Sequence, residues 1–126
     1  MKLVAIIFAV FALAIVPSRQ DVVSASDACN AIGKFYEQGC SGLTSALLGR
    51  SWKQASAYRR GDAIGSYGRY RALTPGTIVG FMGHVAVYTG RRRDTCNCMF
   101  VDVQGPRKHA RCLQTYGSQA VYEYSY

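Results

Sequence analysis

The chain has 126 residues and a net charge of +8, with 49% of its residues hydrophobic and 17% charged. This length fits one domain, because domains commonly contain about 100–150 residues. The hydrophobic content excludes an intrinsically disordered chain, and 13 Gly with only 3 Pro exclude a collagen-like or proline-rich one. Five Cys are many for so short a chain, and they need an explanation.

The first residues have the three-part organisation of a secretory signal peptide. Lys2 supplies a positive charge, residues 3–16 carry no polar side chain, and a proline ends the run. A membrane anchor is less favoured, because spanning a bilayer takes about 20 apolar residues. We therefore expect residues 1–18 to be a signal peptide, with cleavage as late as residue 26. Residues 27–126 would then form a single domain that is secreted and extracellular, where disulfides persist.

The positive charge favours attraction to a polyanion such as a bacterial wall, a nucleic acid or an acidic membrane, and charge alone does not select among them. The one tight basic run, at residues 91–93, is flanked by Gly and Asp and is typical of a solvated turn. Tyr122, Tyr124 and Tyr126 alternate, which predicts an edge strand instead of a base-stacking surface. We therefore expect no nucleic-acid partner, no stable membrane insertion and a monomeric protein.

Two helices are expected in the first half of the chain. The spacing of apolar side chains predicts one over residues 26–38, with Ser26 as its cap. A second helix is predicted to begin at Cys40 and to end at Gly49. Residues 51–70 are ambiguous, and we expect a helical turn or two followed by a glycine-rich loop there.

Short strands are expected in the second half of the chain, where β-branched and aromatic residues are separated by turns. The predicted strands cover residues 77–81, 85–88, 99–103 and 120–124. Helices thus come first and an antiparallel sheet follows, which predicts an α+β fold.

Cys40 differs from the other cysteines, because it lies between two glycines where a helix is expected to begin. A helix N-terminus carries a partial positive charge, which stabilises a thiolate and lowers the pKa of a cysteine placed there. The free N–H groups at Cys40 and Ser41 can also hold a developing oxyanion. The alternatives are a disulfide cysteine or a small buried thiol.

A thiolate needs a base, and the chain contains two His. His84 stands at the head of an alternating strand, which is a stiff support for a catalytic side chain, whereas His109 lies in a basic loop. The imidazole also needs an acceptor that fixes its tautomer. Asp102 and Gln104, which share one face of the next predicted strand, are the candidates.

Five Cys cannot all pair within one chain, so at least one is left over. A direct bond between Cys96 and Cys98 would close a tight ring with strained geometry. We therefore expect one of them to pair with Cys112 and the other with Cys29. No metal or cofactor is predicted, because secreted thiols oxidise and Cys96-x-Cys98 is not accompanied by a Cys-x-x-Cys or by two closely spaced His.

Three motifs of this chain resemble the NlpC/P60 family of cysteine peptidases. They read Gly-Cys-Ser-Gly-Leu at residues 39–43, Leu-Thr-Pro-Gly-Thr-Ile-Val at 73–79 and Gly-His-Val-Ala-Val-Tyr at 83–88. They occur in the family's order and span about half of the expected mature chain. The resemblance implies a reduced papain-like core, with the nucleophile at a helix N-terminus and the base and orienting residue on adjacent strands.

The resemblance assigns a role to each candidate. Cys40 would be the nucleophile and a free thiol, His84 the general base, and Asp102 the residue that orients the imidazole, with Gln104 as second choice. The family's upstream Tyr often lines the oxyanion site, and Tyr36 is the nearest candidate, although it lies only four residues before the nucleophile.

The chain departs from the family pattern at three positions. Gly39 replaces the usual Asp before the nucleophile, and Thr77 replaces the Asp after Pro-Gly. Asp102 replaces the usual His, and a carboxylate would hold the imidazole by a charge-assisted hydrogen bond.

The resemblance implies a secreted amidase or endopeptidase that cleaves stem-peptide amide bonds of bacterial peptidoglycan. A small secreted chain with added Cys is similar to the bacteriolytic members of this family from mites and ticks. One alternative is a non-catalytic cationic antimicrobial or binding protein, in which Cys40 would lie in a disulfide. Another is a related thiol enzyme that acts on lipid acyl groups or other amides.

Overall fold

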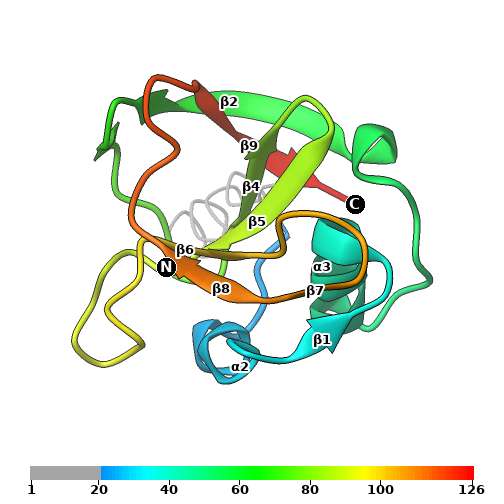
Figure 1. The fold of residues 1–126 in the computed structure, drawn as a ribbon. Helices are drawn as coiled ribbons and strands as arrows, with labels where there is room; N and C mark the ends of the chain where they lie inside the picture. Colours follow the sequence, from blue (N-terminus) through cyan, green and yellow to red (C-terminus); the bar gives the residue numbers. More distant parts are fainter. Residues whose placement is uncertain (1–20) are drawn as a thin grey trace, which may run out of the picture.

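The computed structural model describes residues 21–126, so the predicted signal peptide at residues 1–18 lies outside the described residues. The fold is mixed α+β and mostly β, with a curled antiparallel sheet (Figure 1). Its helical segments are α2 (Ala25–Asn30), α3 (Gly39–Leu48) and the 3-10 turn η1 (Ala55–Ala57). Its strands are β1 (Phe35–Tyr36), β2 (Arg59–Ser66), β3 (Arg69–Tyr70), β4 (Ile78–Phe81), β5 (His84–Tyr88), β6 (Phe100–Asp102), β7 (Lys108–His109), β8 (Arg111–Leu113) and β9 (Val121–Ser125).

Seven strands form the main sheet in the order β3-β2-β9-β4-β5-β6-β8, while β1 and β7 form a separate two-stranded ribbon. The four strands expected from the sequence are confirmed to within one residue at each end. The expected edge position of Tyr122 and Tyr124 is wrong, because β9 pairs with β2 on one side and with β4 on the other. The edge is covered by β2, which forms within the glycine-rich segment where a loop was expected.

The first predicted helix is much shorter than expected. α2 begins after Ser24, whose side-chain oxygen accepts a hydrogen bond from the backbone N–H of Asp27 at 3.1 Å, so Ser26 is not the cap. The helix ends before Gly33, which has a left-handed φ of 89° and donates its N–H to the carbonyl of Ala110 at 2.8 Å. The chain then forms β1, which pairs with β7. The backbone N–H and C=O groups that a longer helix would have paired internally thus form hydrogen bonds to this distant strand instead.

The second predicted helix is confirmed. α3 ends at Gly49, which adopts a left-handed φ of 68° and donates its N–H to the carbonyl of Ala46 at 3.1 Å. This is the C-terminal arrangement that glycine favours, because it has no Cβ to clash with the preceding turn.

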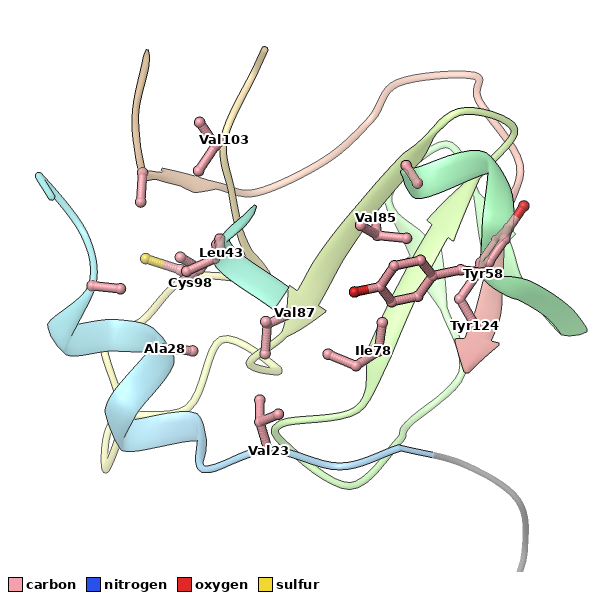
Figure 2. Close-up of a cluster of buried hydrophobic side chains, with 14 residues drawn as sticks. Val23, Ala28, Leu43, Tyr58, Ile78, Val85, Val87, Cys98, Val103 and Tyr124 are labelled. Carbon is pink, nitrogen blue, oxygen red and sulfur yellow. The ribbon is translucent and has the colours of Figure 1, made fainter. Parts of the chain in front are cut away.

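The two faces of the sheet bury different side chains. Along β5, Val85 and Val87 belong to the first core cluster, while Ala86 and Tyr88 belong to the second. Helices α2 and α3 contribute Ala28 and Leu43 to the first cluster, and Figure 2 shows both side chains among the strand residues. The second cluster has no helical member and is smaller, and aromatic residues make up a larger share of it: Phe100 and Tyr88 are buried, with Tyr70 and Tyr116 packed against them.

Two disulfides tie the loop between β5 and β6, one to helix α2 and the other to strand β8. Cys29 of α2 is bonded to Cys96, and Cys98 is bonded to Cys112 of β8. This confirms the expected set of four cysteines and decides the pairing that the sequence left open. The cysteine that remains free is Cys40.

Candidate active site

Cys40 lies in the first turn of α3, where the backbone N–H groups have no partner within the helix. The residue before it, Gly39, has a left-handed φ of 69°, and a Cβ added there would lie 2.8 Å from the carbonyl carbon of Gly105. Only glycine fits this position, because the loop after β6 passes so close to the start of the helix. An Asp at position 39 is therefore sterically excluded in this chain.

The thiol of Cys40 is half-buried and lies next to the imidazole of His84, which interacts with it electrostatically. Burial alone raises the pKa of the thiol. The interaction with His84, together with hydrogen bonds from the backbone N–H groups of Val85 and Ser41, outweighs burial and lowers the pKa below its usual value. The sulfur is therefore held in an environment that favours the thiolate.

His84 is the first residue of β5, and its Nε2–H donates to Oδ2 of Asp102 at 2.8 Å. Because Nε2 is engaged in this way, Nδ1 is the ring nitrogen that remains for Cys40. Phe81 stacks on the imidazole with ring centroids 5.0 Å apart, and the ring of Tyr116 meets it edge-on at 5.6 Å. These contacts fix the orientation of the ring.

The charge state of His84 follows from its two partners. Burial lowers the pKa of the imidazole, but the hydrogen bond to Asp102, the interaction with Cys40 and the charges of both groups raise it to about 9. A raised imidazole pKa and a lowered thiol pKa together favour a thiolate–imidazolium pair at neutral pH.

Asp102 is fully buried at the end of β6 and accepts hydrogen bonds from three side chains. Besides His84, Arg111 donates from Nε to Oδ1 at 2.8 Å, and Tyr116 donates its hydroxyl to Oδ2. Burial raises the pKa of the carboxyl group, but these donors lower it to about 2. Asp102 is thus a carboxylate over the whole range in which His84 titrates.

Gln104 does not share this position, which corrects the expectation that it lies on one strand face with Asp102. The pairing of Val87 with Val101 would place Gln104 opposite His84 if both strands continued. Instead β6 ends at Asp102, and the side chain of Gln104 is exposed to solvent.

Tyr36 and Ser41 have less direct relations to the thiol. Tyr36 lies on β1 and lines a groove of about 320 Å³ with Ala46 and Leu47, from later turns of α3. Within residues 21–126 no hydrogen bond joins its side chain to Cys40. The side chain of Ser41 accepts a hydrogen bond from Nε1 of Trp52 at 2.9 Å. The backbone N–H of Ser41, a separate group, is one of those that lower the pKa of the Cys40 thiol.

Two residues of this site, Arg111 and Tyr116, were not predicted from the sequence. Arg111 faces Asp102 because β8 pairs with β6 and the two residues are register partners. The burial of Tyr116 beside Asp102 strongly raises the pKa of its phenol, so it acts as a neutral donor. A usable signal for Arg111 would have been a strand over residues 111–113, but nothing in the sequence links Tyr116 to a site 14 residues earlier.

Among residues 21–126, no group of three or more His, Cys, Asp or Glu side chains is placed to hold a metal ion. No helix in this part of the chain is long and apolar enough to cross a membrane. Comparisons of the chain with models of protein families, with curated proteins and with solved structures gave no match.

Proposed function

We propose that this protein is a secreted cysteine amidase or endopeptidase that cleaves stem-peptide amide bonds of bacterial peptidoglycan. The observation that carries the proposal is the placement of the free, half-buried thiol of Cys40 next to His84, whose imidazole is hydrogen-bonded to the buried carboxylate of Asp102. A nucleophile next to a base, and a base bonded to an orienting group, is the arrangement that acyl transfer by a thiol requires.

The first half of the proposed reaction forms a thioester. The thiolate of Cys40 attacks the amide carbonyl carbon, and the carbonyl electrons move to an oxyanion at the start of α3. Backbone N–H groups of Cys40 and its neighbours are the nearest donors for this charge. The tetrahedral intermediate then collapses, the C–N bond breaks, and the imidazolium of His84 gives its proton to the leaving amine.

The second half regenerates the thiol. Neutral His84 takes a proton from a water molecule, which attacks the thioester carbonyl. The C–S bond breaks, a carboxylic acid is released, and the thiolate–imidazolium pair forms again. Asp102 stays ionised throughout and holds the imidazole in one orientation, as expected of a carboxylate with such a low pKa.

The fold is consistent with the reduced papain-like core that the NlpC/P60 resemblance implies. The proposed nucleophile opens a helix, while the proposed base and orienting residue lie on the paired strands β5 and β6. Two disulfides are typical of a protein that folds in an oxidising compartment, which supports secretion.

Digestion of purified peptidoglycan tests the proposal. Mass analysis of the soluble products should show stem-peptide fragments with one new amine and one new carboxyl group for each cut. The Cys40→Ala protein, which should be folded, is the matched control and should release no fragments. Intact peptidoglycan after prolonged incubation with wild-type protein whose Cys40 thiol is free and whose two disulfides are intact would contradict the proposal.

The cationic binding alternative is favoured by one observation, the exposure of Arg91, Arg92 and Arg93 on a single loop. It expects Cys40 to be in a disulfide, whereas the structure leaves Cys40 free and pairs the other four cysteines. Killing of bacteria by the Cys40→Ala protein at the wild-type concentration would favour this alternative over the enzyme.

A further inference from the structure

Trp52 is the only tryptophan of the chain, and 46% of its side chain is exposed. It lies between α3 and η1, and its Nε1–H donates to the side-chain oxygen of Ser41 at 2.9 Å. Ser41 directly follows Cys40 and is buried. The indole is therefore one side chain away from the proposed nucleophile, with its polar edge turned toward the protein.

The two residues just before Trp52 are each held by a hydrogen bond. The backbone N–H of Arg50 donates to the carbonyl of Ser45 at 3.0 Å, and the hydroxyl of Tyr126 donates to the carbonyl of Ser51 at 2.6 Å. These bonds, together with the one to Ser41, fix the position of an indole that the core does not bury. An exposed and immobilised aromatic ring is a common feature of binding sites, since it offers a large contact area at a small entropic cost.

We propose that Trp52 is a glycan-stacking residue, whose indole face packs on the C–H face of a pyranose ring in the sugar strand of the substrate. The indole N–H is already bonded to Ser41, so its flat faces are what remains for a ligand. The amino acids of a stem peptide are small or charged, whereas a pyranose presents a broad apolar face. This inference rests on the proposed function, because it names the part of peptidoglycan that binds beside the scissile peptide.

A second exposed apolar residue lies close to His84 in the sequence. Met82 is 89% exposed and occupies the turn between β4 and β5, two residues before His84. Each proposed catalytic residue therefore has an exposed apolar residue near it, Trp52 through its bond to Ser41 and Met82 two positions before His84. This favours an extended ligand that continues beyond the scissile bond, as a peptide attached to a sugar strand does.

The single tryptophan makes a direct test possible. The Cys40→Ala protein is titrated with soluble, peptide-free glycan oligosaccharides while tryptophan fluorescence is recorded, and the signal comes from Trp52 alone. We expect a saturable change in intensity and emission wavelength with the oligosaccharides and none with free stem peptides. No change with the oligosaccharides, or a change with stem peptides only, would overturn the proposal.

Variants give a second measurement. Trp52→Ala should weaken retention on peptidoglycan about tenfold, as truncation of an aromatic anchor commonly does, and Trp52→Phe should retain part of the affinity. Tyr67→Ala, which removes an exposed aromatic ring from the β2–β3 turn, is the matched control and should bind as wild type does. Equal retention of wild type, Trp52→Ala and Trp52→Phe would overturn the proposal.

The outcome is separable from that of the proposed function. If the wild-type protein releases no fragments but Trp52 still responds to oligosaccharides, the glycan site stands and the amidase fails. If fragments are released and Trp52 does not respond, the amidase stands and the glycan site fails.

Discussion

The two faces of the sheet contribute different parts of the candidate site. The face under α2 and α3 is mainly aliphatic and is stapled by the disulfides, and its helix α3 carries Cys40. Along β5 and β6 the even-numbered residues Ala86 and Phe100 face the aromatic cluster, and His84 and Asp102 continue the same alternation. The proposed nucleophile thus comes from one face and its proposed base from the other, and they meet at the end of β5.

This division indicates how each part is stabilised. The helical face holds Cys40 by packing, by close approach of the backbone at Gly39 and by covalent bonds. The aromatic face holds His84 and Asp102 by ring stacking and by a buried network of charged hydrogen bonds. Changes on the helical face should therefore affect the free energy of unfolding or the thiol itself, while changes on the aromatic face should affect the charge and orientation of the base.

The largest effect is expected where the two faces meet. Cys40→Ala and His84→Ala should each lower amide hydrolysis about 10⁴-fold or more, because residues that act as a unit fail together. The double variant should be no slower than either single one. These losses are measured as hydrolysis rates. Circular dichroism checks that the variants are folded. Additive losses in the double variant would show that the two residues do not act together.

The next largest effect is expected on the aromatic face. Asp102→Asn should lower hydrolysis by about 10²–10⁴-fold, since the imidazole loses its charged acceptor and its fixed tautomer. Gln104→Ala, a matched change two residues further along the chain, should leave the rate as it is, because that side chain is exposed. A loss for Gln104→Ala equal to that for Asp102→Asn would transfer the orienting role to Gln104.

Removal of the disulfides should act on stability. In a Cys40→Ala background, which prevents thiol exchange, replacement of either pair by Ala should lower the free energy of unfolding by about 2–4 kcal/mol. The Cys29–Cys96 bond spans 67 residues and the Cys98–Cys112 bond 14, so loss of the first should cost about 1.4 kcal/mol more. Denaturant unfolding measures both losses in the free energy of unfolding. If loss of the Cys29–Cys96 bond costs no more than loss of the Cys98–Cys112 bond, the loop-entropy explanation is contradicted.

The pH dependence should report the thiolate–imidazolium pair. Activity should fall on the alkaline side as His84 loses its proton at about pH 9. It should fall on the acid side as the Cys40 thiolate takes up a proton, at a pH below the usual pKa of a thiol. Because the pKa of His84 is raised on folding, the stability that it contributes is complete below its unfolded pKa of about 6.5 and is lost as the pH rises through 9. The rate of Cys40 alkylation, measured against pH, tests the titration of the pair. The Tm, measured against pH, tests the stability that His84 contributes.

The smallest effect is expected for Tyr116→Phe, which removes one donor from Asp102 and leaves the ring in place. Hydrolysis should fall by about tenfold, the range expected for one hydrogen bond to a charged group. The pKa of Asp102 is lowered by this donor, so its loss should raise that pKa and shift acid unfolding to higher pH. Tyr67→Phe, which removes an exposed hydroxyl, is the control. An acid unfolding midpoint that does not move would show that Tyr116 has no part in holding the carboxylate.

Local features of the sequence were sufficient for much of the fold. The helix from Gly39 to Leu48 and the four strands of the second half follow from apolar spacing, glycine ends and turn residues, all of which act within a few positions. The short α2 and the strand β2 were not predictable in this way. Gly33 ends α2 with a bond to Ala110, and β2 is stabilised by its partner β9, so both depend on residues far along the chain.

By itself the sequence determined the chemistry that is available: one unpaired cysteine at the start of a helix, one histidine at the head of a strand, and four cysteines for two bonds. Only the tertiary structure decided which of Asp102 and Gln104 meets His84, which cysteines pair, and that Arg111 and Tyr116 complete the network. The reason is physical. Residue type and local spacing set what a side chain can do, whereas strand register and the point at which a strand leaves the sheet set which side chain it meets.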